Sequence, residues 1–181
     1  MAKNIAAAIR NCIPLSGSMT AMDFGCGTGL ISRELFPNLG KITAVDTSPG
    51  MIEQLQKRIQ ESGIANIQAH CLDLLTDPPG ETFDLIFSSM ALHHVQDTAA
   101  LLDRFTELLN PGGRLALADL DREDGSFHGN FNGFLHYGFS RETLTNYLDR
   151  LGYTGISIET AHTVHKNARD YPVFLLTARR S

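Results

Sequence analysis

Short apolar runs alternate along most of the chain with longer segments of helical periodicity. The runs that we interpret as buried strands are SMTAMDF (18–24), KITAVD (41–46), NIQAHCL (66–72), TFDLIFSS (82–89) and RLALADL (114–120). Between them, segments 28–36, 50–62 and 97–110 repeat apolar residues three or four positions apart, which predicts helices, and residues 3–13 carry a weaker pattern of this kind. Strands that alternate with helices predict an α/β fold with a doubly wound, parallel sheet.

Several segment boundaries carry residues typical of helix ends. Ser48, Asp97 and Ser140 each stand directly before or at the start of a helical segment, where a side-chain oxygen can cap the first backbone N–H groups. Gly63 and Gly152 stand at the far ends of two of these segments, as expected for a residue that ends a helix. The boundaries therefore support the predicted order of elements.

The chain after residue 120 departs from the alternation. A polar, glycine-rich stretch, 121–139, precedes a last helical segment at 140–152. Two apolar runs follow, GISIETA (155–161) and PVFLLTA (172–178), and the connection between them, 162–171, suits an antiparallel hairpin. Long irregular stretches inside a compact domain are usually functional or mobile, so we expect one of these properties for 121–139.

Length and composition fit one globular domain. The 181 residues are 43% apolar and 19% charged, and no repeat or linker divides them, so we predict a single domain over 1–181. Residues 2–15 are too short, and too interrupted by Lys3, Arg10 and Pro14, for a signal peptide or a membrane span. We therefore expect a cytoplasmic protein that does not associate with membranes.

Charge and metal-binding residue types narrow the possible ligands. The formal net charge is −5, whereas a protein that binds duplex nucleic acid needs a basic face. The odd number of cysteines has no CxxC spacing, so we expect reduced thiols. His162 and His165 stand three apart without an evident third ligand, so no metal site is predicted. A small molecule is therefore the expected substrate, and the sequence leaves the oligomeric state open.

The first predicted strand ends in a glycine loop within AMDFGCGTGL (21–30). Gly25, Gly27 and Gly29 follow the spacing G-x-G-x-G, whereas the dinucleotide motif G-x-G-x-x-G requires a glycine where Leu30 stands. No Gly-Lys-Ser/Thr follows, which excludes a P-loop. Asp23, two positions before the first glycine, would repel a pyrophosphate and attract an ammonium or sulfonium group.

The stretch Asp23-Phe24-Gly25-Cys26-Gly27-Thr28-Gly29 resembles motif I of the class I S-adenosylmethionine-dependent methyltransferases. The resemblance covers residues 15–120 closely and the remainder by topology only. It implies a seven-stranded, mostly parallel sheet in the order 3-2-1-4-5-7-6, with the last strand antiparallel and helices on both faces. It also implies S-adenosylmethionine as the cofactor and S-adenosylhomocysteine as its product.

The resemblance further implies a set of cofactor-binding residues. In the family, the acid at the position of Asp46 accepts both ribose hydroxyls, and the acid at Asp73 accepts from the adenine amino group. Singly, an aspartate after a strand is more often a cap or a turn residue, and the joint register favours the functional interpretation. The residues that match cofactor positions are Asp23, Gly25, Cys26, Gly27, Gly29, Asp46, Thr47, Met51, Asp73, Leu74 and Ser88.

Methyl transfer from a sulfonium requires alignment of the acceptor and exclusion of water, and a base only where the acceptor loses a proton. His94, beyond the fourth strand, is the candidate base, and His93 is a candidate acceptor contact. The alternative is a structural pair, with one ring bonded to the backbone and one facing the cleft.

The resemblance places the segment after strand five over the active site, which makes His128, His136 and Tyr137 candidate acceptor contacts. The phenylalanines of this stretch indicate either an apolar lid or part of the core: Phe127, Phe131, Phe134 and Phe139.

Three functions remain to be separated. The leading one is methyl transfer from S-adenosylmethionine, by in-line displacement, to a small acceptor whose identity the sequence does not define. A binding module without turnover is the alternative, suggested by the few residues before the first strand, where many relatives carry helices over the acceptor site. A nicotinamide-dependent reductase conflicts with the glycine spacing and with Asp23.

Residues 88–91, Ser-Ser-Met-Ala, depart from the Asn/Asp-Pro-Pro-aromatic motif of amino-directed DNA methylation. This departure disfavours a nucleic-acid substrate.

Overall fold

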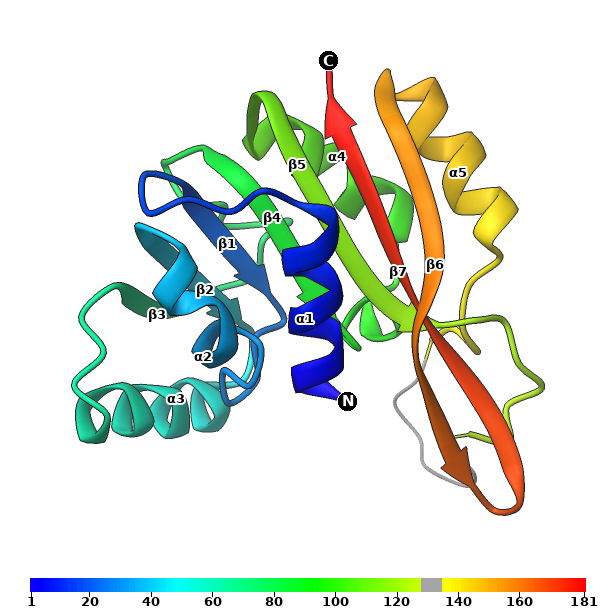
Figure 1. Ribbon diagram of the computed structural model, residues 1–181, viewed down its shortest axis with the longest axis horizontal. Coiled ribbons are helices and arrows are strands. Elements are labelled where there is room, and N and C mark those ends of the chain that lie inside the picture. The colour runs from blue at the N-terminus through cyan, green and yellow to red at the C-terminus, as the bar shows by residue number, and fades with distance from the viewer. Residues whose placement is uncertain (128–134) are drawn as a thin grey trace.

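The computed structural model describes residues 1–127 and 135–181. Within these residues, seven strands form one sheet in the order β3-β2-β1-β4-β5-β7-β6 (Figure 1). The strands are β1 Thr20–Phe24, β2 Lys41–Asp46, β3 Ile67–Cys71, β4 Phe83–Ser89, β5 Leu109–Leu120, β6 Tyr153–Lys166 and β7 Arg169–Arg180. The first five pair in parallel, and β7 runs antiparallel to both β5 and β6. The predicted fold class and strand order are confirmed.

Helices cover both faces of the sheet (Figure 1). They are α1 Ala2–Cys12, α2 Ser32–Leu35, α3 Pro49–Glu61, α4 Thr98–Leu108 and α5 Arg141–Arg150, with the 3₁₀ turns η1 Phe36–Asn38 and η2 Leu92–His94. Leu85 and Phe87 of β4 pack into one core cluster with α1, α2 and α3, whereas Ile86 packs into the other with α4 and α5. Neighbouring strand residues point to opposite faces, so the central strands are buried on both sides.

The predicted caps are present at three helix starts. The side chains of Ser48, Asp97 and Ser140 accept hydrogen bonds from backbone N–H groups in the first turns of α3, α4 and α5. Gly63 and Gly152 adopt positive φ angles of 63° and 82° just beyond α3 and α5. Glycine ends these helices because it tolerates the left-handed conformation.

The predicted helix over 28–36 is shorter in the structure. Residues 28–31 are turns, α2 comprises only Ser32–Leu35, and η1 follows directly. Gly27 and Gly29 have φ angles of 52° and 74°, which no right-handed helix accommodates. The apolar periodicity of this segment therefore reflects packing of turns onto the core rather than a continuous helix.

The connection between the last two strands, predicted over 162–171, is much shorter in the structure. β6 and β7 continue along the chain to Lys166 and Arg169 and meet in a two-residue turn formed by Asn167 and Ala168. Both turn residues have positive φ, 52° and 58°, as in the mirror-image turns that suit the twist of hairpins. The hairpin therefore extends past the end of β5 as a two-stranded arm (Figure 1).

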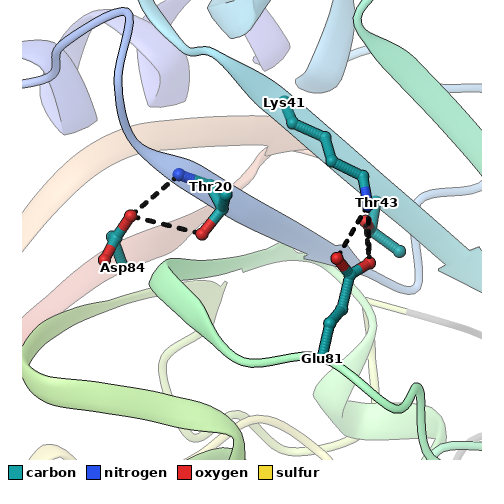
Figure 2. Close-up of polar contacts among 5 residues, drawn as sticks. All are labelled: Thr20, Lys41, Thr43, Glu81 and Asp84. Atoms are coloured by element: carbon teal, nitrogen blue, oxygen red, sulfur yellow. Dashed lines mark hydrogen bonds and ion pairs between the residues drawn. The ribbon is translucent and has the colours of Figure 1, made fainter.

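Polar contacts tie the strands together near their amino ends (Figure 2). The Asp84 carboxylate accepts hydrogen bonds from the backbone N–H and the hydroxyl of Thr20, at 2.9 and 3.2 Å. Glu81 accepts from the Lys41 ammonium at 2.7 Å and from the Thr43 hydroxyl at 2.8 Å. Although burial opposes it, these bonds lower the pKa of Glu81. The contacts brace the amino ends of β1, β2 and β4, opposite to the carboxyl ends of these strands.

Candidate ligand-binding site

A cavity of about 960 Å³ lies at the carboxyl ends of the central strands. Its wall is built from the loops after β1, β2, β3 and β4 and from the start of α4. The strand order reverses between β1 and β4, which pair side by side although two strands separate them in sequence. This is the position at which open α/β sheets bind ligands.

Within the described residues, no helix is long and apolar enough to cross a membrane.

The three glycines of the loop after β1 serve different purposes. A Cβ atom on Gly25 would lie 2.3 Å from Cβ of Ala91, and one on Gly29 would lie 2.3 Å from Cδ1 of Leu55. A Cβ on Gly27 would meet nothing within 4 Å, and this residue lines the cavity. Gly25 and Gly29 therefore permit close packing, whereas Gly27 leaves its backbone open to a ligand.

Asp46, at the end of β2, lines the cavity and holds the glycine loop. Its Oδ2 accepts the backbone N–H of Gly27 at 2.8 Å, and its Oδ1 accepts that of Ser48 at 2.9 Å. A carboxylate has about four lone-pair sites, so each oxygen can accept a further hydrogen bond. Asp46 is thus suited to receive two neighbouring hydroxyl groups while it holds the loop.

The loop after β3 supplies a second carboxylate and an apolar wall. Asp73 and Leu74 line the cavity, as do Thr47 and Met51 from the loop after β2 and the first turn of α3. Oδ1 of Asp73 accepts the backbone N–H of Leu75 at 2.9 Å, which fixes the side chain in its loop. Apolar side chains on both sides of a carboxylate suit a flat ring that carries an amino group.

Asp23 does not line the cavity. It is 2% exposed, and its Oδ2 accepts a 2.6 Å hydrogen bond from the Ser32 hydroxyl. Burial raises the pKa of Asp23 to about 7, even though the bond from Ser32 acts in the opposite direction. The structure therefore places this carboxyl group beneath the glycine loop, where it contacts α2.

Cys26 and Ser88 also lie outside the cavity lining. The backbone N–H of Cys26 donates to the carbonyl of Val45 at 3.0 Å, and burial raises the pKa of its thiol. The Ser88 hydroxyl donates to the carbonyl of Phe24 at 2.9 Å. The Ser88 hydroxyl thus ties β4 to the end of β1, and the Cys26 backbone ties the glycine loop to β2.

The two adjacent histidines point to different surroundings. His94 lines the cavity, whereas His93 is 2% exposed and does not. Nδ1 of His93 lies 2.7 Å from Oδ1 of Asp119, a residue at the end of β5. The structure therefore does not bring His93 to the cavity, and Nδ1 of its ring is bonded to the Asp119 side chain.

His136 and Tyr137 lie beside the large cavity and line a smaller one of about 390 Å³. Nε2 of His136 lies 2.9 Å from the carbonyl oxygen of Val95 and 3.3 Å from Oγ1 of Thr98. The Tyr137 side chain is exposed. Among the phenylalanines of the stretch, Phe127 packs against one core cluster and Phe139 against the other. The predicted contacts His128, Phe131 and Phe134 lie outside the described residues.

The cavity also contains residues that the sequence did not indicate as ligand contacts, among them Ser48, Gln96 and Asp97. Asp97 was predicted only as a helix cap, and its Oδ1 does accept the N–H of Ala100 at 2.9 Å. Among the described residues, the lining holds three aspartates and neither lysine nor arginine. Such a wall favours a cationic or neutral ligand over a phosphate.

Comparison with known proteins agrees with this geometry. Residues 21–113, just over half of the chain, match a family model described as a methyltransferase domain. An uncharacterized methyltransferase of Schizosaccharomyces pombe is 34% identical over 145 residues, which cover 71% of this chain and 51% of that protein. A ubiquinone biosynthesis O-methyltransferase of Xylella fastidiosa is 40% identical over 118 residues, covering 64% and 47%. The chain spans about half the length of these relatives.

A solved structure supports the fold. The N-methyltransferase NodS from Bradyrhizobium japonicum, in complex with S-adenosylhomocysteine, superimposes with a TM-score of 0.77 at 20% identity, covering 99% of this chain and 85% of that one. The sheet order and the glycine loop define a doubly wound α/β protein with an acidic cavity at its switch point. By the family match, the chain belongs to the family of methyltransferase domains.

Proposed function

We propose that this chain binds S-adenosylmethionine in the 960 Å³ cavity and transfers its methyl group to a small-molecule acceptor. The observation that carries the proposal is the convergence of Asp46, Asp73 and the open backbone at Gly27 on a cavity whose described lining holds neither lysine nor arginine. Two carboxylates from neighbouring loops match the hydrogen-bond donors of an adenosine, and the acidic wall matches a sulfonium.

The residues take distinct roles in this proposal. Asp46 receives the ribose hydroxyls, and Asp73 with the backbone of Leu74 meets the adenine edge. Thr47 and Met51 pack on the ring face. Gly25 lines the cavity beside Gly27. The buried members of the predicted set shape the walls instead of touching the ligand: Asp23, Cys26, Gly29 and Ser88.

The bound cofactor supplies a methyl group already activated by its sulfonium leaving group. The protein aligns the acceptor and excludes water, and the apolar residues Met90, Ala91 and Val95 line the cavity beside His94. Where the acceptor carries an O–H or N–H⁺ proton, we assign its removal to the His94 imidazole, which faces the same cavity. The cavity is at the upper end of the usual size for ligand sites, which leaves room for a second molecule.

Titration calorimetry with S-adenosylmethionine, S-adenosylhomocysteine and NAD tests the binding step. We expect both adenosyl ligands to bind and NAD not to bind; binding of NAD alone would overturn the proposal. A panel of phenols, amines, thiols and carboxylic acids then tests turnover, with formation of S-adenosylhomocysteine followed by mass spectrometry. Phenols come first because one relative is named an O-methyltransferase. Binding without turnover on any member would favour the binding module.

Three further expectations belong to this proposal. Residues 1–181 act as one domain, supported by a sheet that runs from β1 to the last strand. The protein works in the cytoplasm, a reducing compartment, as supported by three free cysteine thiols. The acceptor is not a nucleic acid, because the net charge is −5 and the cleft is acidic.

A further inference from the structure

The segment after β5 closes on itself at its base. The N–H of Phe139 donates to the carbonyl of Leu120 at 2.9 Å, and the N–H of Arg122 donates back to the carbonyl of Phe139 at 3.0 Å. One step further out, the N–H of Glu123 donates to the carbonyl of Tyr137 at 2.9 Å. The two ends of the segment are therefore joined where β5 finishes.

A second attachment lies at η2, on the wall of the large cavity. The carbonyl oxygen of His93 accepts the N–H groups of Leu135 and His136, at 3.1 and 3.3 Å. Nε2 of the His136 ring lies 2.9 Å from the carbonyl oxygen of Val95, so all three bonds join residues 135–136 to the chain that follows β4. The position of residues 135–136 thus depends on where η2 lies.

Asp119 contacts η2 through His93. This residue is fully buried at the end of β5, and its carboxyl group lies within hydrogen-bond distance of three nitrogens. It accepts the N–H of Leu120 at 2.8 Å and the N–H of His93 at 3.3 Å, and Nδ1 of His93 lies at 2.7 Å. Two backbone donors make this group an acceptor, so we assign the proton of the third bond to Nδ1.

We propose that Asp119 and His93 form a positioning pair that holds residues 135–136 at the acceptor side of the cavity. The side chain of His93 in η2 bonds to Asp119, and the backbone carbonyl of His93 accepts the N–H groups of residues 135–136. His94 is the next residue of η2 and lines the cavity, so the same pair sets its place. The name acceptor side rests on the proposed function, whereas the attachment of residues 135–136 to η2 does not.

Two substitutions at His93 distinguish the effect of its hydrogen bond to Asp119 from the effect of its side-chain volume. His93→Asn keeps an N–H donor close to the position of Nδ1, and His93→Gln moves the donor one methylene further away. Amide hydrogen exchange at Leu135 and His136, followed by NMR, reports the attachment. We expect His93→Gln to accelerate exchange at both amides at least about tenfold, because local opening then becomes easier, and His93→Asn to stay within about threefold of wild type.

Asp84→Asn is the matched control, because it makes an Asp-to-Asn change of a hydrogen-bonded carboxylate near the opposite edge of the sheet (Figure 2). It should leave exchange at residues 135–136 within about threefold of wild type. Asp119→Asn should perturb the Nδ1 proton resonance of His93, whereas Asp84→Asn should not. Unchanged exchange in folded His93→Gln, or equal acceleration in both His93 variants, would overturn the positioning pair.

A titration with S-adenosylhomocysteine keeps this result apart from the proposed function. We expect all four variants to bind it within about threefold of wild type, because neither His93 nor Asp119 lines the cavity. If wild-type protein fails to bind, the proposed function fails while the exchange result still decides the positioning pair. If wild type binds and the exchange rates do not respond to His93→Gln, only the positioning pair fails.

Discussion

Oδ2 of Asp46 lies 2.8 Å from the backbone nitrogen of Gly27, so the last residue of β2 holds the glycine loop that follows β1. Its other oxygen holds Ser48, the cap of α3. One carboxylate thus joins two loops of the cavity before any ligand arrives. Preorganisation of this kind lowers the entropic cost of ordering the loops on binding. Asp46 therefore acts both as a proposed ligand contact and as the residue that holds the two loops in place.

Asp46→Asn should therefore weaken binding of S-adenosylhomocysteine more than the loss of one contact would. The amide offers only one acceptor oxygen, so it cannot serve both loops and two hydroxyls. Charge-assisted hydrogen bonds contribute about 1.5–3 kcal/mol each, so the loss of one bond corresponds to a roughly 10- to 150-fold loss of affinity. Because more than one bond is affected, we expect a loss of at least about 100-fold. Calorimetric titration of wild type and variant measures it.

Asp97→Asn serves as the comparison for this change. Asp97 lines the same cavity, but its carboxylate caps α4 through Ala100, and asparagine caps about as well as aspartate. We expect its affinity to change by less than about threefold. Equal losses in both variants would mean that general charge, rather than the position of Asp46, governs binding.

The glycines of the loop should respond differently to alanine. Gly29→Ala places a methyl group 2.3 Å from Cδ1 of the buried Leu55, and overpacking of a core typically costs about 1–3 kcal/mol. Gly27→Ala meets no atom within 4 Å and carries only the cost of a left-handed alanine, about 1–2 kcal/mol, but its methyl group stands in the cavity wall.

Urea unfolding and calorimetric titration together separate the two cases. Gly29→Ala should lose more stability, and Gly27→Ala should lose more affinity for S-adenosylhomocysteine. The reverse order in either measurement would contradict the division of roles between the two glycines.

Asp23 should make stability depend on pH in an unusual direction. Its pKa is raised by burial from the ordinary value of 3.8 to about 7, so the folded state binds the proton more tightly than the unfolded state. Between these values the folded state holds more protons, and this contribution to stability is present at low pH and lost as the pH rises towards about 7. The full effect is at most about 4 kcal/mol.

Asp23→Asn imitates the protonated carboxyl group and removes the titration. Urea unfolding at several values between about pH 3.5 and pH 8 should show similar stability for both proteins at the acidic end. At the alkaline end the variant should be the more stable one. Ser32→Ala deletes the hydroxyl that lowers the pKa of Asp23, so the decline should then extend to higher pH. Parallel curves for wild type and Asp23→Asn would contradict the assignment.

Sequence patterns were sufficient for the sheet and for the residues at its carboxyl edge. Asp46 and Asp73 line the cavity because the ends of parallel strands meet at one edge, a consequence of topology alone. The same argument could not tell that Asp23 faces α2, because the side of a strand on which a residue points depends on packing. His93 likewise has its partner at Asp119, 26 positions away, which no local pattern reveals.

The turn between β6 and β7 was missed for a different physical reason. Two-residue hairpins with positive φ at both positions normally carry glycine or asparagine, and here Ala168 occupies the second position. Without that signal, residues 162–171 resemble an irregular connection. The strand pairing supplies enough hydrogen bonds to hold alanine in a conformation that it otherwise avoids.

Ala168→Gly should consequently stabilise the protein. Alanine at a φ of 58° carries a strain of about 1–2 kcal/mol, whereas glycine adopts this conformation freely and loses part of the gain through its more flexible unfolded state. We expect a net increase in the free energy of unfolding of about 0.5 kcal/mol, measured from the urea midpoint at constant slope. Ala161→Gly, within β6 and without positive φ, is the control and should destabilise instead. If both variants lost stability equally, the turn strain inferred for Ala168 would be absent.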